Sequence, residues 1–421
     1  MADYKQTKEQ PKTRILYVHY GEDWIRGSEV VLLELLQSAK WQNYQPVLWC
    51  NSSVLAKKAR SLGIEVIQDN FVCIGYWILP RWNIIQFFNL MLKAKKLIKQ
   101  YKVKLVHCNN GAPCQWMTPI CKITQTPMLL HLHARYMYRD RLTLLFHGAD
   151  SIVGVSQSVI KAFKNDEFSR QDVSIIYNGI NVNRIKTNKP LDLRAKLSAE
   201  NSDFVILFVG SLIPRKRVDQ LIYALSTLQG TYSIKLAIVG SGSEKAKLAQ
   251  LSTTLGLDDH IQFFSDNDEV STYYASNADC FISVPTEEVF GLTLAEASLA
   301  KLPIITSNIE GINEIYKHQE NALLVTPNKM SELIDAIKVL IDSPDTRTNY
   351  ADKAHNHITE NFSCNKQFMQ FHLAYQNLLT KKKYYRFFST LAFEFSALFK
   401  AFMNKGYQYL MVKLAWGKHH D

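Results

Sequence analysis

Short apolar runs alternate with longer stretches of helical periodicity along most of the chain. The first run, Arg14–His19, is typical of a buried strand, and apolar residues recur at helical spacing over 30–36 after a glycine-containing loop. Similar strand-like runs follow at Tyr44–Trp49, Ile64–Ile67, Lys104–Cys108, Met128–His131, Ser151–Val155 and Val173–Ile176. Strands that alternate with helices in this way predict a parallel sheet covered on both faces.

A second series of the same kind follows a polar stretch. Residues Asn181–Asp203 contain Pro190 and few clustered apolar side chains, which indicates a connection between domains. Further strand-like runs then come at Phe204–Val209, Ser233–Val239, Ile261–Phe264, Cys280–Val284, Pro303–Ile305 and Ala322–Val325. The sequence therefore predicts two α/β domains, over 14–182 and 183–365, which bind ligands beyond the carboxyl ends of their strands.

The end of the chain has a different composition. A helix over 366–380 is expected to return to the first domain, and 381–421 holds eight Lys or Arg against two Asp or Glu. The formal net charge of +11 is therefore concentrated in this tail. A basic tail on a nearly balanced body favours a local anionic surface as partner and argues against nucleic acid.

The first residues and the cysteines indicate a cytoplasmic protein. The first thirteen residues are polar, and no apolar run reaches the roughly 18 residues that a membrane-spanning helix requires. The seven cysteines are odd in number, and several lie in strand-like runs, so we interpret them as reduced thiols of the core.

The segment Pro285–Glu296, with the sequence PTEEVFGLTLAE, carries the most distinctive chemistry. It follows a predicted buried strand and leads into a helix, so Glu288 is expected in the loop and Glu296 just inside the helix. Carboxylates there can accept hydrogen bonds from sugar hydroxyls. The free backbone N–H groups of Gly291, Leu292 and Thr293 suit a phosphate.

This segment resembles the Glu, seven residues, Glu signature of family-four retaining glycosyltransferases of the GT-B fold, also called glycosyl transferases group 1. The resemblance covers about residues 14–380 and continues, in chain order, at Gly27-Ser28-Glu29, Pro127–His133, Ala149–Ser156, Ile176–Ile180, Gly210–Asp219, Val239–Gly242, Ala278-Asp279, Gly311–Glu314 and Asn321–Val325. It implies two Rossmann-like domains that face each other across a cleft, the first on the acceptor side and the second binding a nucleotide sugar, with a C-terminal helical extension.

The resemblance also implies a role for individual residues. Glu296 matches the glutamate that holds the ribose hydroxyls, and Glu288 matches the one that contacts the transferred hexose. Lys216, helped by Arg215, matches the basic group on the donor diphosphate, where fixed charge stabilises the leaving group. His133 matches a histidine near the transferred sugar. The remaining donor-binding positions that the resemblance implies are Gly27, Gly210, Ser211, Gly240, Phe290, Gly291, Leu292 and Thr293.

Three positions depart from the family pattern. Ser211 stands where many relatives have an arginine on the donor phosphate, so that charge must come from Arg215, Lys216 or Arg217, or be missing. Val289 replaces the usual glycine beside Glu288, and Lys301 also replaces a glycine. These departures concern the shape of the hexose pocket more than the class of reaction.

The sequence therefore predicts a retaining, metal-independent hexosyltransferase that uses a UDP- or GDP-type sugar as co-substrate and has no cofactor. We find no Asp-x-Asp signature where metal-dependent transferases carry it and no Cys or His cluster with zinc spacing. The expected acceptor is a cell-surface glycan or glycolipid, such as a lipid-linked oligosaccharide or lipopolysaccharide core. Two alternatives stay open: a nucleotide-sugar epimerase of the same fold, and an inactive protein that binds nucleotide.

The tail suggests attachment to the inner face of an anionic membrane. Lys381, Lys382, Lys383 and Arg386 would lie at the headgroups, with Phe395, Phe399 and Phe402 in the boundary layer. Alternatively, the tail packs on the protein or forms an oligomer contact. Trp77, Trp82, Phe87 and Phe88, ahead of the basic stretch Lys93–Lys99, suggest a second membrane contact, although a buried helix explains them equally well.

Overall fold

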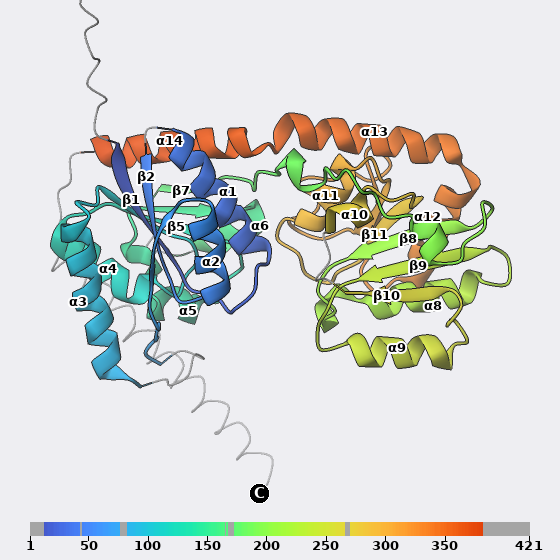
Figure 1. The fold of residues 1–421 in the computed structure, drawn as a ribbon, viewed down its shortest axis with the longest axis horizontal. Coiled ribbons are helices and arrows are strands. Elements are labelled where there is room, and N and C mark those ends of the chain that lie inside the picture. Colours follow the sequence, from blue (N-terminus) through green and yellow to red (C-terminus); the bar gives the residue numbers. More distant parts are fainter. Residues whose placement is uncertain are drawn as a thin grey trace, which may run out of the picture. The chain divides into compact units, whose positions relative to one another are not determined.

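The computed structural model describes residues 12–42, 44–75, 82–164, 166, 172–265 and 270–381. Two parallel sheets organise these residues into two units, which Figure 1 shows as ribbons. Unit 1 contains the chain up to Val155, residues Val159–Ile176 and the chain from Phe368. Unit 2 contains Ser156–Ser158 and Tyr177–Gln367.

The sheet of unit 1 has seven strands in the order β3-β2-β1-β4-β5-β6-β7, and all neighbouring strands are parallel. Its strands are β1 (Thr13–His19), β2 (Tyr44–Cys50), β3 (Glu65–Gln68), β4 (Leu105–Cys108), β5 (Met128–Leu132), β6 (Ser151–Gly154) and β7 (Asp172–Ile175). The helices are α1 (Gly27–Trp41), α2 (Ser53–Ser61), α3 (Ile84–Gln100), α4 (Cys114–Thr124), α5 (Tyr138–Thr143), α6 (Gln157–Lys164) and α14 (Cys364–Thr380), with a short turn η1 (Phe146–Gly148).

The central strands of unit 1 are buried on both faces, which explains their continuous apolar sequence. Residues Ile15–Val18 of β1 have no exposed surface, and the same holds for β4 and most of β5. The core also includes Phe368, Phe371 and Tyr375 of α14, which pack with β1 and β4. Helix α14 is the expected helix at 366–380, and these three side chains belong to unit 1.

The sheet of unit 2 has six strands in the order β10-β9-β8-β11-β12-β13, again all parallel. Its strands are β8 (Phe204–Val209), β9 (Ile234–Val239), β10 (Ile261–Phe264), β11 (Cys280–Ser283), β12 (Ile304–Ser307) and β13 (Leu323–Val325). The helices are α7 (Leu193–Lys196), α8 (Val218–Leu228), α9 (Lys245–Thr254), α10 (Val270–Tyr274), α11 (Leu292–Leu299), α12 (Met330–Asp342) and α13 (Pro344–Asn361), with turns η2 (Val182–Arg184) and η3 (Pro214–Lys216).

The order of strands reverses at one place in each sheet. In unit 1 this switch point lies between β1 and β4, and in unit 2 it lies between β8 and β11. The loops that leave the carboxyl ends of such neighbouring strands run in opposite directions, which opens a crevice between them. The two switch points are therefore where side chains for ligand binding are expected.

The predicted α/β class with two parallel sheets is confirmed, and each of the thirteen strand-like runs of the sequence overlaps a strand. The polar stretch Asn181–Asp203 differs from the expectation of a simple connection. It belongs to unit 2, and its Leu193 and Leu197 are buried in that unit's core. Scattered apolar residues in a polar stretch give no periodic signal, although two of them suffice to fix the segment on the core.

All seven cysteines are free thiols, and six of them are buried, as the sequence indicated. Burial raises the pKa of the Cys50 thiol to about 12. Cys364 is partly exposed.

Within the ranges that the structure describes, no helix combines the length and the apolar character that crossing a membrane requires.

Candidate active site

Lys216 and Glu288 form a close ion pair at the switch point of unit 2. Lys216 ends turn η3, a few residues after β8, and Glu288 lies in the loop after β11. The Lys216 Nζ atom is 2.5 Å from Glu288 Oε2, and both side chains are largely buried. Burial opposes ionisation of Glu288, but Lys216 and then Arg215 outweigh it, so the pKa of Glu288 lies below its ordinary value. The carboxylate is therefore charged at neutral pH.

Backbone contacts hold the two loops of this pair against each other. The N–H group of Thr286 donates to the carbonyl of Arg215 at 2.9 Å. In the other direction, the Arg215 guanidinium donates to the carbonyl of Glu287 at 2.9 Å. These reciprocal bonds fix the separation of the loops, and with it the position of Lys216 relative to Glu288.

The three neighbouring cations differ in what they contact. Arg217 makes two bonds of 3.0 Å to the carboxylate of Asp219, and Lys216 is bound to Glu288. Arg215 lies 3.6 Å from Glu288 and keeps 45% of its side chain exposed. Of the three residues expected to replace the charge missing at Ser211, Arg215 and Lys216 lie at the switch point, while Arg217 is held by Asp219.

Glu296 occupies a buried position in the second turn of α11. Its Oε1 accepts a hydrogen bond of 3.1 Å from Arg184, and its Oε2 accepts one of 3.1 Å from the Tyr274 hydroxyl. Burial raises the pKa of Glu296, and these two partners only partly offset that effect. Arg184 and Tyr274 are too distant in sequence from Glu296 for any sequence motif to have identified them.

The loop between Glu288 and α11 depends on two glycines. Gly291 has a φ of +83°, a left-handed conformation that admits the sharp entry into α11. Gly311, from the predicted GINE motif, lies under the loop, and a Cβ atom on it would come within 2.5 Å of the Glu288 carbonyl. Because the carbonyl belongs to the backbone, a larger residue at 311 would displace the Glu288 loop.

The remaining donor-binding positions of unit 2 fall into two groups. Gly210 and Ser211 follow β8 and Gly240 follows β9, and the Gly210 N–H donates to Val239 at 3.0 Å, so these turns are neighbours. Leu292 and Thr293 form the first turn of α11 and are partly exposed. Phe290 is different because the whole residue is buried and its ring packs against Phe362.

In unit 1, His133 follows β5 and contacts a buried polar group. Its Nε2 lies 3.1 Å from Asn109 Oδ1, and Asn109 follows β4 at the switch point. Because an amide oxygen only accepts hydrogen bonds, His133 carries a proton on Nε2. Burial and then the neighbouring His131 lower the pKa of His133 well below its ordinary value, so the ring is neutral.

A second buried pair, His19 and Glu29, connects the same switch point to α1. His19 Nε2 is 2.9 Å from Glu29 Oε1, and His19 Nδ1 is 2.9 Å from the Asn109 carbonyl. Burial raises the pKa of Glu29, but the hydrogen bond and charge of His19 outweigh it and lower the value to about 2. Glu29 also accepts a bond of 3.0 Å from the backbone N–H of Arg26, which fixes the start of α1 at Gly27.

The structure thus assembles the predicted residues in two groups. Unit 2 brings Arg215, Lys216 and Glu288 into contact and places Glu296 in the helix that follows, whereas His133 and Gly27 belong to unit 1. Sequence reasoning missed His19 and Asn109, although both stand at the carboxyl end of a strand, which is a signal that could have found them. Within the described part of the chain, no group of three or more His, Cys, Asp or Glu side chains could hold a metal ion.

Unit 2 therefore presents cations, a buried carboxylate and the start of a helix beyond the ends of adjacent parallel strands, an arrangement suited to a phosphorylated, hydroxyl-bearing ligand. Two family models match the chain: glycosyl transferases group 1 over residues 191–357 and glycosyltransferase family 4 over residues 25–184. The chain belongs to the family-four glycosyltransferases of the GT-B fold.

Among solved structures, this glycosyltransferase is similar to HepE of Anabaena, which was solved in complex with UDP and glucose. The two share 21% sequence identity and a TM-score of 0.74, over 87% of this chain and 100% of HepE. At that identity the likeness establishes the fold, and its extent agrees with the predicted two-domain architecture.

Curated relatives of this glycosyltransferase match over shorter lengths. An uncharacterized glycosyltransferase of Methanocaldococcus jannaschii is 28% identical over 45% of this chain and 50% of its own length. The O-antigen biosynthesis glycosyltransferase WclY of Escherichia coli is 27% identical over 58% of this chain and 63% of its own length. The chain thus spans about half to just under two thirds of the length of these relatives.

Proposed function

We propose that this glycosyltransferase moves a hexose, with retention of configuration, from a UDP- or GDP-type donor to a cell-surface glycan acceptor. The observation that carries the proposal is the buried pair of Lys216 and Glu288 beside the first turn of α11, at the switch point of unit 2. The complex of HepE with UDP and glucose supports a nucleotide-sugar donor, because HepE has the same fold.

Lys216 and Arg215 would bind the donor diphosphate. A diphosphate gains negative charge as the sugar–phosphate bond breaks, and a cation already in place stabilises that charge without reorganisation. Lys216 has three N–H donors and uses one on Glu288, which leaves others for phosphate oxygens. The first-turn N–H groups of Leu292 and Thr293 add donors from α11.

The two glutamates would bind the hydroxyl groups of the donor. Glu288 is held ionised by Lys216 and can accept hydrogen bonds from the hexose. Glu296 would accept bonds from the ribose hydroxyls, which requires its carboxylate to exchange the Arg184 contact for the sugar. Such an exchange is reasonable because Arg184 keeps 37% of its side chain exposed and can turn toward water.

In the proposed reaction, the bond from the anomeric carbon to the diphosphate oxygen breaks while the acceptor oxygen bonds the same carbon on the same face. The proton of the acceptor hydroxyl passes to the departing phosphate oxygen, so no nucleophile from the protein takes part. We propose no metal ion for this step, because Lys216 and Arg215 supply the positive charge. His133, neutral and protonated on Nε2, is assigned to the sugar side in unit 1.

The acceptor that we propose is a lipid-linked oligosaccharide or a lipopolysaccharide core. The similarity to WclY, an O-antigen biosynthesis enzyme, supports a surface polysaccharide. Such acceptors place the enzyme in the cytoplasm, peripheral on the inner face of the membrane. The predicted contacts Lys382, Lys383, Arg386, Phe395, Phe399 and Phe402 lie outside the described residues, while Lys381 forms an ion pair with Asp172.

A donor screen followed by a matched pair of variants tests this proposal. The nucleotide sugar that binds should raise the unfolding temperature of the protein by mass action, whereas other nucleotide sugars should not. Turnover of that donor should then fall by roughly a hundredfold or more in Glu288→Gln, because a contact to the reacting sugar is lost. The control Glu287→Gln alters the neighbouring exposed glutamate.

Three results would count against the proposal. Turnover of the donor without any acceptor, giving an isomeric nucleotide sugar, would identify an epimerase. Binding without any turnover, in the presence of acceptor extracts, would identify an inactive nucleotide-binding protein. Equal turnover in Glu288→Gln and Glu287→Gln would remove Glu288 from the site.

A further inference from the structure

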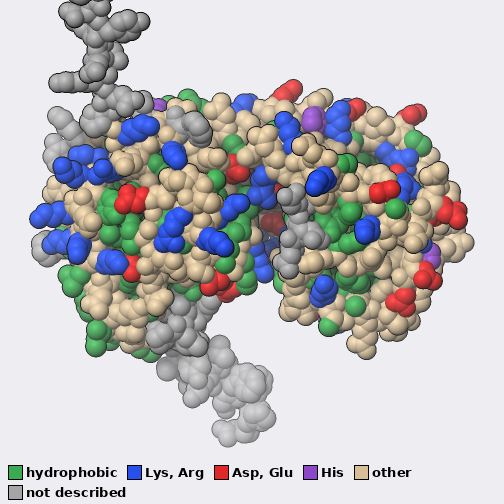
Figure 2. Space-filling model, viewed as in Figure 1, with side chains coloured by type: hydrophobic (Ala, Val, Ile, Leu, Met, Phe, Trp, Pro, Cys, Tyr) green, Lys and Arg blue, Asp and Glu red, His purple; other side chains and the backbone are tan. Residues whose placement is uncertain are grey.

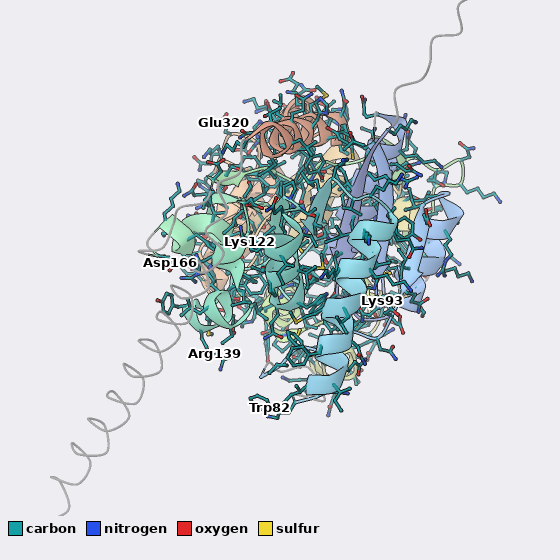
Figure 3. The ribbon with its side chains drawn as sticks, turned by 90° about the vertical axis from the view of Figure 1, so that its left-hand side faces the viewer. Trp82, Lys93, Lys122, Arg139, Asp166 and Glu320 are labelled. Carbon is teal, nitrogen blue, oxygen red and sulfur yellow. The ribbon has the colours of Figure 1, made fainter. Side chains whose placement is uncertain are left out.

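Helix α3 carries large apolar side chains on a face that the described residues leave open to solvent. Ile85 is 78% exposed and Leu92 67%, and Ile84 and Phe88 are more than half exposed. Trp82, just ahead of the helix, is 70% exposed, and Figure 3 places it at the end of α3. Single exposed apolar residues are common on soluble proteins, but five within eleven residues form a patch that needs a partner.

Helical geometry places these side chains on one stripe. With about 3.6 residues per turn, residues 84, 85, 88 and 92 fall within roughly 100° of one another around the helix axis. The residues that α3 buries in unit 1 are Leu90, Ala94, Leu97 and Ile98, which lie on the opposite side. The first turns of α3 are therefore apolar on both faces, and the core of unit 1 uses only one of them.

The last turns of α3 continue the same stripe with positive charge. Lys95, Lys96 and Lys99 are exposed there, and α3 contains no Asp or Glu. Lys93 is different because it turns to the side and pairs with Asp69 at 2.6 Å. In Figure 2, hydrophobic atoms gather below and Lys and Arg above on the side of unit 1 where α3 runs.

We infer that the α3 face, defined as Trp82, Ile84, Ile85, Phe88, Leu92, Lys95, Lys96 and Lys99, docks on an anionic lipid bilayer. A bilayer presents anionic headgroups and hydrocarbon within a few ångströms of each other, and the α3 face presents lysines and apolar side chains along one stripe. A nucleic acid would match the lysines alone, and an apolar protein surface would match the apolar side chains alone. The sequence had left a buried helix open as the alternative, and the exposure of Phe88 and Trp82 decides against it.

The inference rests on the proposed function in one respect only, namely that the acceptor is linked to a lipid of the membrane. An enzyme that modifies a lipid-linked glycan benefits from a bilayer contact on the unit that we assign to the acceptor. The α3 face would bring this unit to the membrane surface whether or not the basic tail binds as well.

The first test measures the apolar contribution with the full-length protein. Sedimentation with vesicles of phosphatidylcholine and phosphatidylglycerol gives the partition coefficient of each variant. Leu92→Gln should weaken binding roughly tenfold, because a leucine side chain no longer enters the boundary layer. The matched control is Leu373→Gln, since Leu373 of α14 is a leucine of unit 1 with 62% exposure and should leave binding unchanged.

The second test measures the charge contribution. Reversing Lys95 and Lys96 together to Glu should weaken binding by about 30-fold or more, since each lysine near an anionic surface contributes about a fivefold factor. The control reverses Lys57 and Lys58, two consecutive exposed lysines of α2, and changes the net charge by the same amount. Binding of the wild type should also fall with rising salt and be weak on pure phosphatidylcholine.

Three outcomes would overturn the inference. The first is unchanged vesicle binding in both α3 variants, and the second is an equal loss of vesicle binding in the two lysine-pair variants, which would indicate diffuse charge attraction. The third is a lipid-free dimer that Leu92→Gln dissociates, which would make the face a contact between copies. Hydrolysis of the soluble donor should be unaffected in the α3 variants, and Lys216→Ala should bind vesicles normally. Failure of the catalytic proposal is therefore distinguishable from failure of this one.

Discussion

The two units have the same kind of parallel sheet but carry different side chains at their switch points. Each has a parallel sheet whose order reverses once, between β1 and β4 in unit 1 and between β8 and β11 in unit 2. At the switch point of unit 1 the structure places His19, Glu29 and Asn109, which bond one another and are fully or almost fully buried. At that of unit 2 it places Arg215, Lys216 and Glu288, of which Arg215 stays exposed.

The difference indicates that the two switch points have different roles. Groups that satisfy one another in a buried network rigidify the loops that carry them, while groups that keep exposed donors can exchange partners when a ligand arrives. We therefore assign unit 1's switch point to fixing the start of α1 and the ring of His133, and unit 2's switch point to binding the donor.

The largest expected effect is on turnover, at unit 2. Lys216→Ala should lower kcat for sugar transfer by roughly 10²- to 10³-fold, because it removes a fixed positive charge from the leaving group. Lys247→Ala, on the exposed surface of α9 in the same unit, should keep wild-type kcat. Steady-state kinetics with the donor found in the screen give both values. A merely raised KM in Lys216→Ala, with kcat retained, would assign Lys216 to ground-state binding instead.

The next effect is on stability, at unit 1. Glu29→Gln should lower the free energy of unfolding by about 3 kcal/mol, because it leaves a buried histidine without its carboxylate partner. Chemical denaturation measures the change. Glu22→Gln is a suitable control, since Glu22 lies in the loop just before α1 and is exposed. If Glu29→Gln had native stability but reduced kcat, the network would serve catalysis rather than rigidity.

The smallest expected effect is a difference between the two units in how their stability depends on pH. Burial lowers the pKa of His107, His131 and His133 from the ordinary 6.5, so the fold favours their neutral forms. A group whose pKa is lowered on folding stabilises the fold at pH values above its pKa in the unfolded state, and this stabilisation is lost as the pH falls. The loss is up to about 1.4 kcal/mol per pH unit for each ring. Unit 1 should therefore lose stability below about pH 6.5.

The buried carboxylate of Glu296 in unit 2 responds to pH with the opposite sign. Burial raises the pKa of Glu296 above 4.5, so this group contributes stability at low pH that is lost as pH rises through its folded value. Hydrogen exchange resolved by peptide, at about pH 5.5 and about pH 7.5, should show β4 and β5 opening more readily at the lower pH while β8 and β11 do not. Uniform loss of protection in both sheets would contradict the contrast.

The sequence predicted the sheets well and the polar networks only in part. Strands such as Phe204–Val209 are buried on both faces, so their apolar character is continuous and visible without tertiary information. Glu288 and Lys216 could be predicted because the family motifs contain them. Arg184 and Tyr274, which bond Glu296, could not, since their contact depends on how distant segments pack.

The α3 face is a second feature that the sequence predicted only in part. The sequence showed the aromatic and apolar residues of α3 ahead of its lysines, but periodicity alone cannot tell which of two apolar faces is buried. Only the packing of Leu90, Ala94 and Leu97 into unit 1 shows that Ile85, Phe88 and Leu92 remain exposed.

The most direct test of the central claim, that unit 2's switch point binds the donor, is hydrogen exchange with and without the nucleoside diphosphate that stabilises the protein most. We predict slower exchange for peptides that contain 291–293 and 210–217, with no change in the peptides of β4 and β5. Protection confined to unit 1, with 291–293 and 210–217 unaffected, would contradict the account.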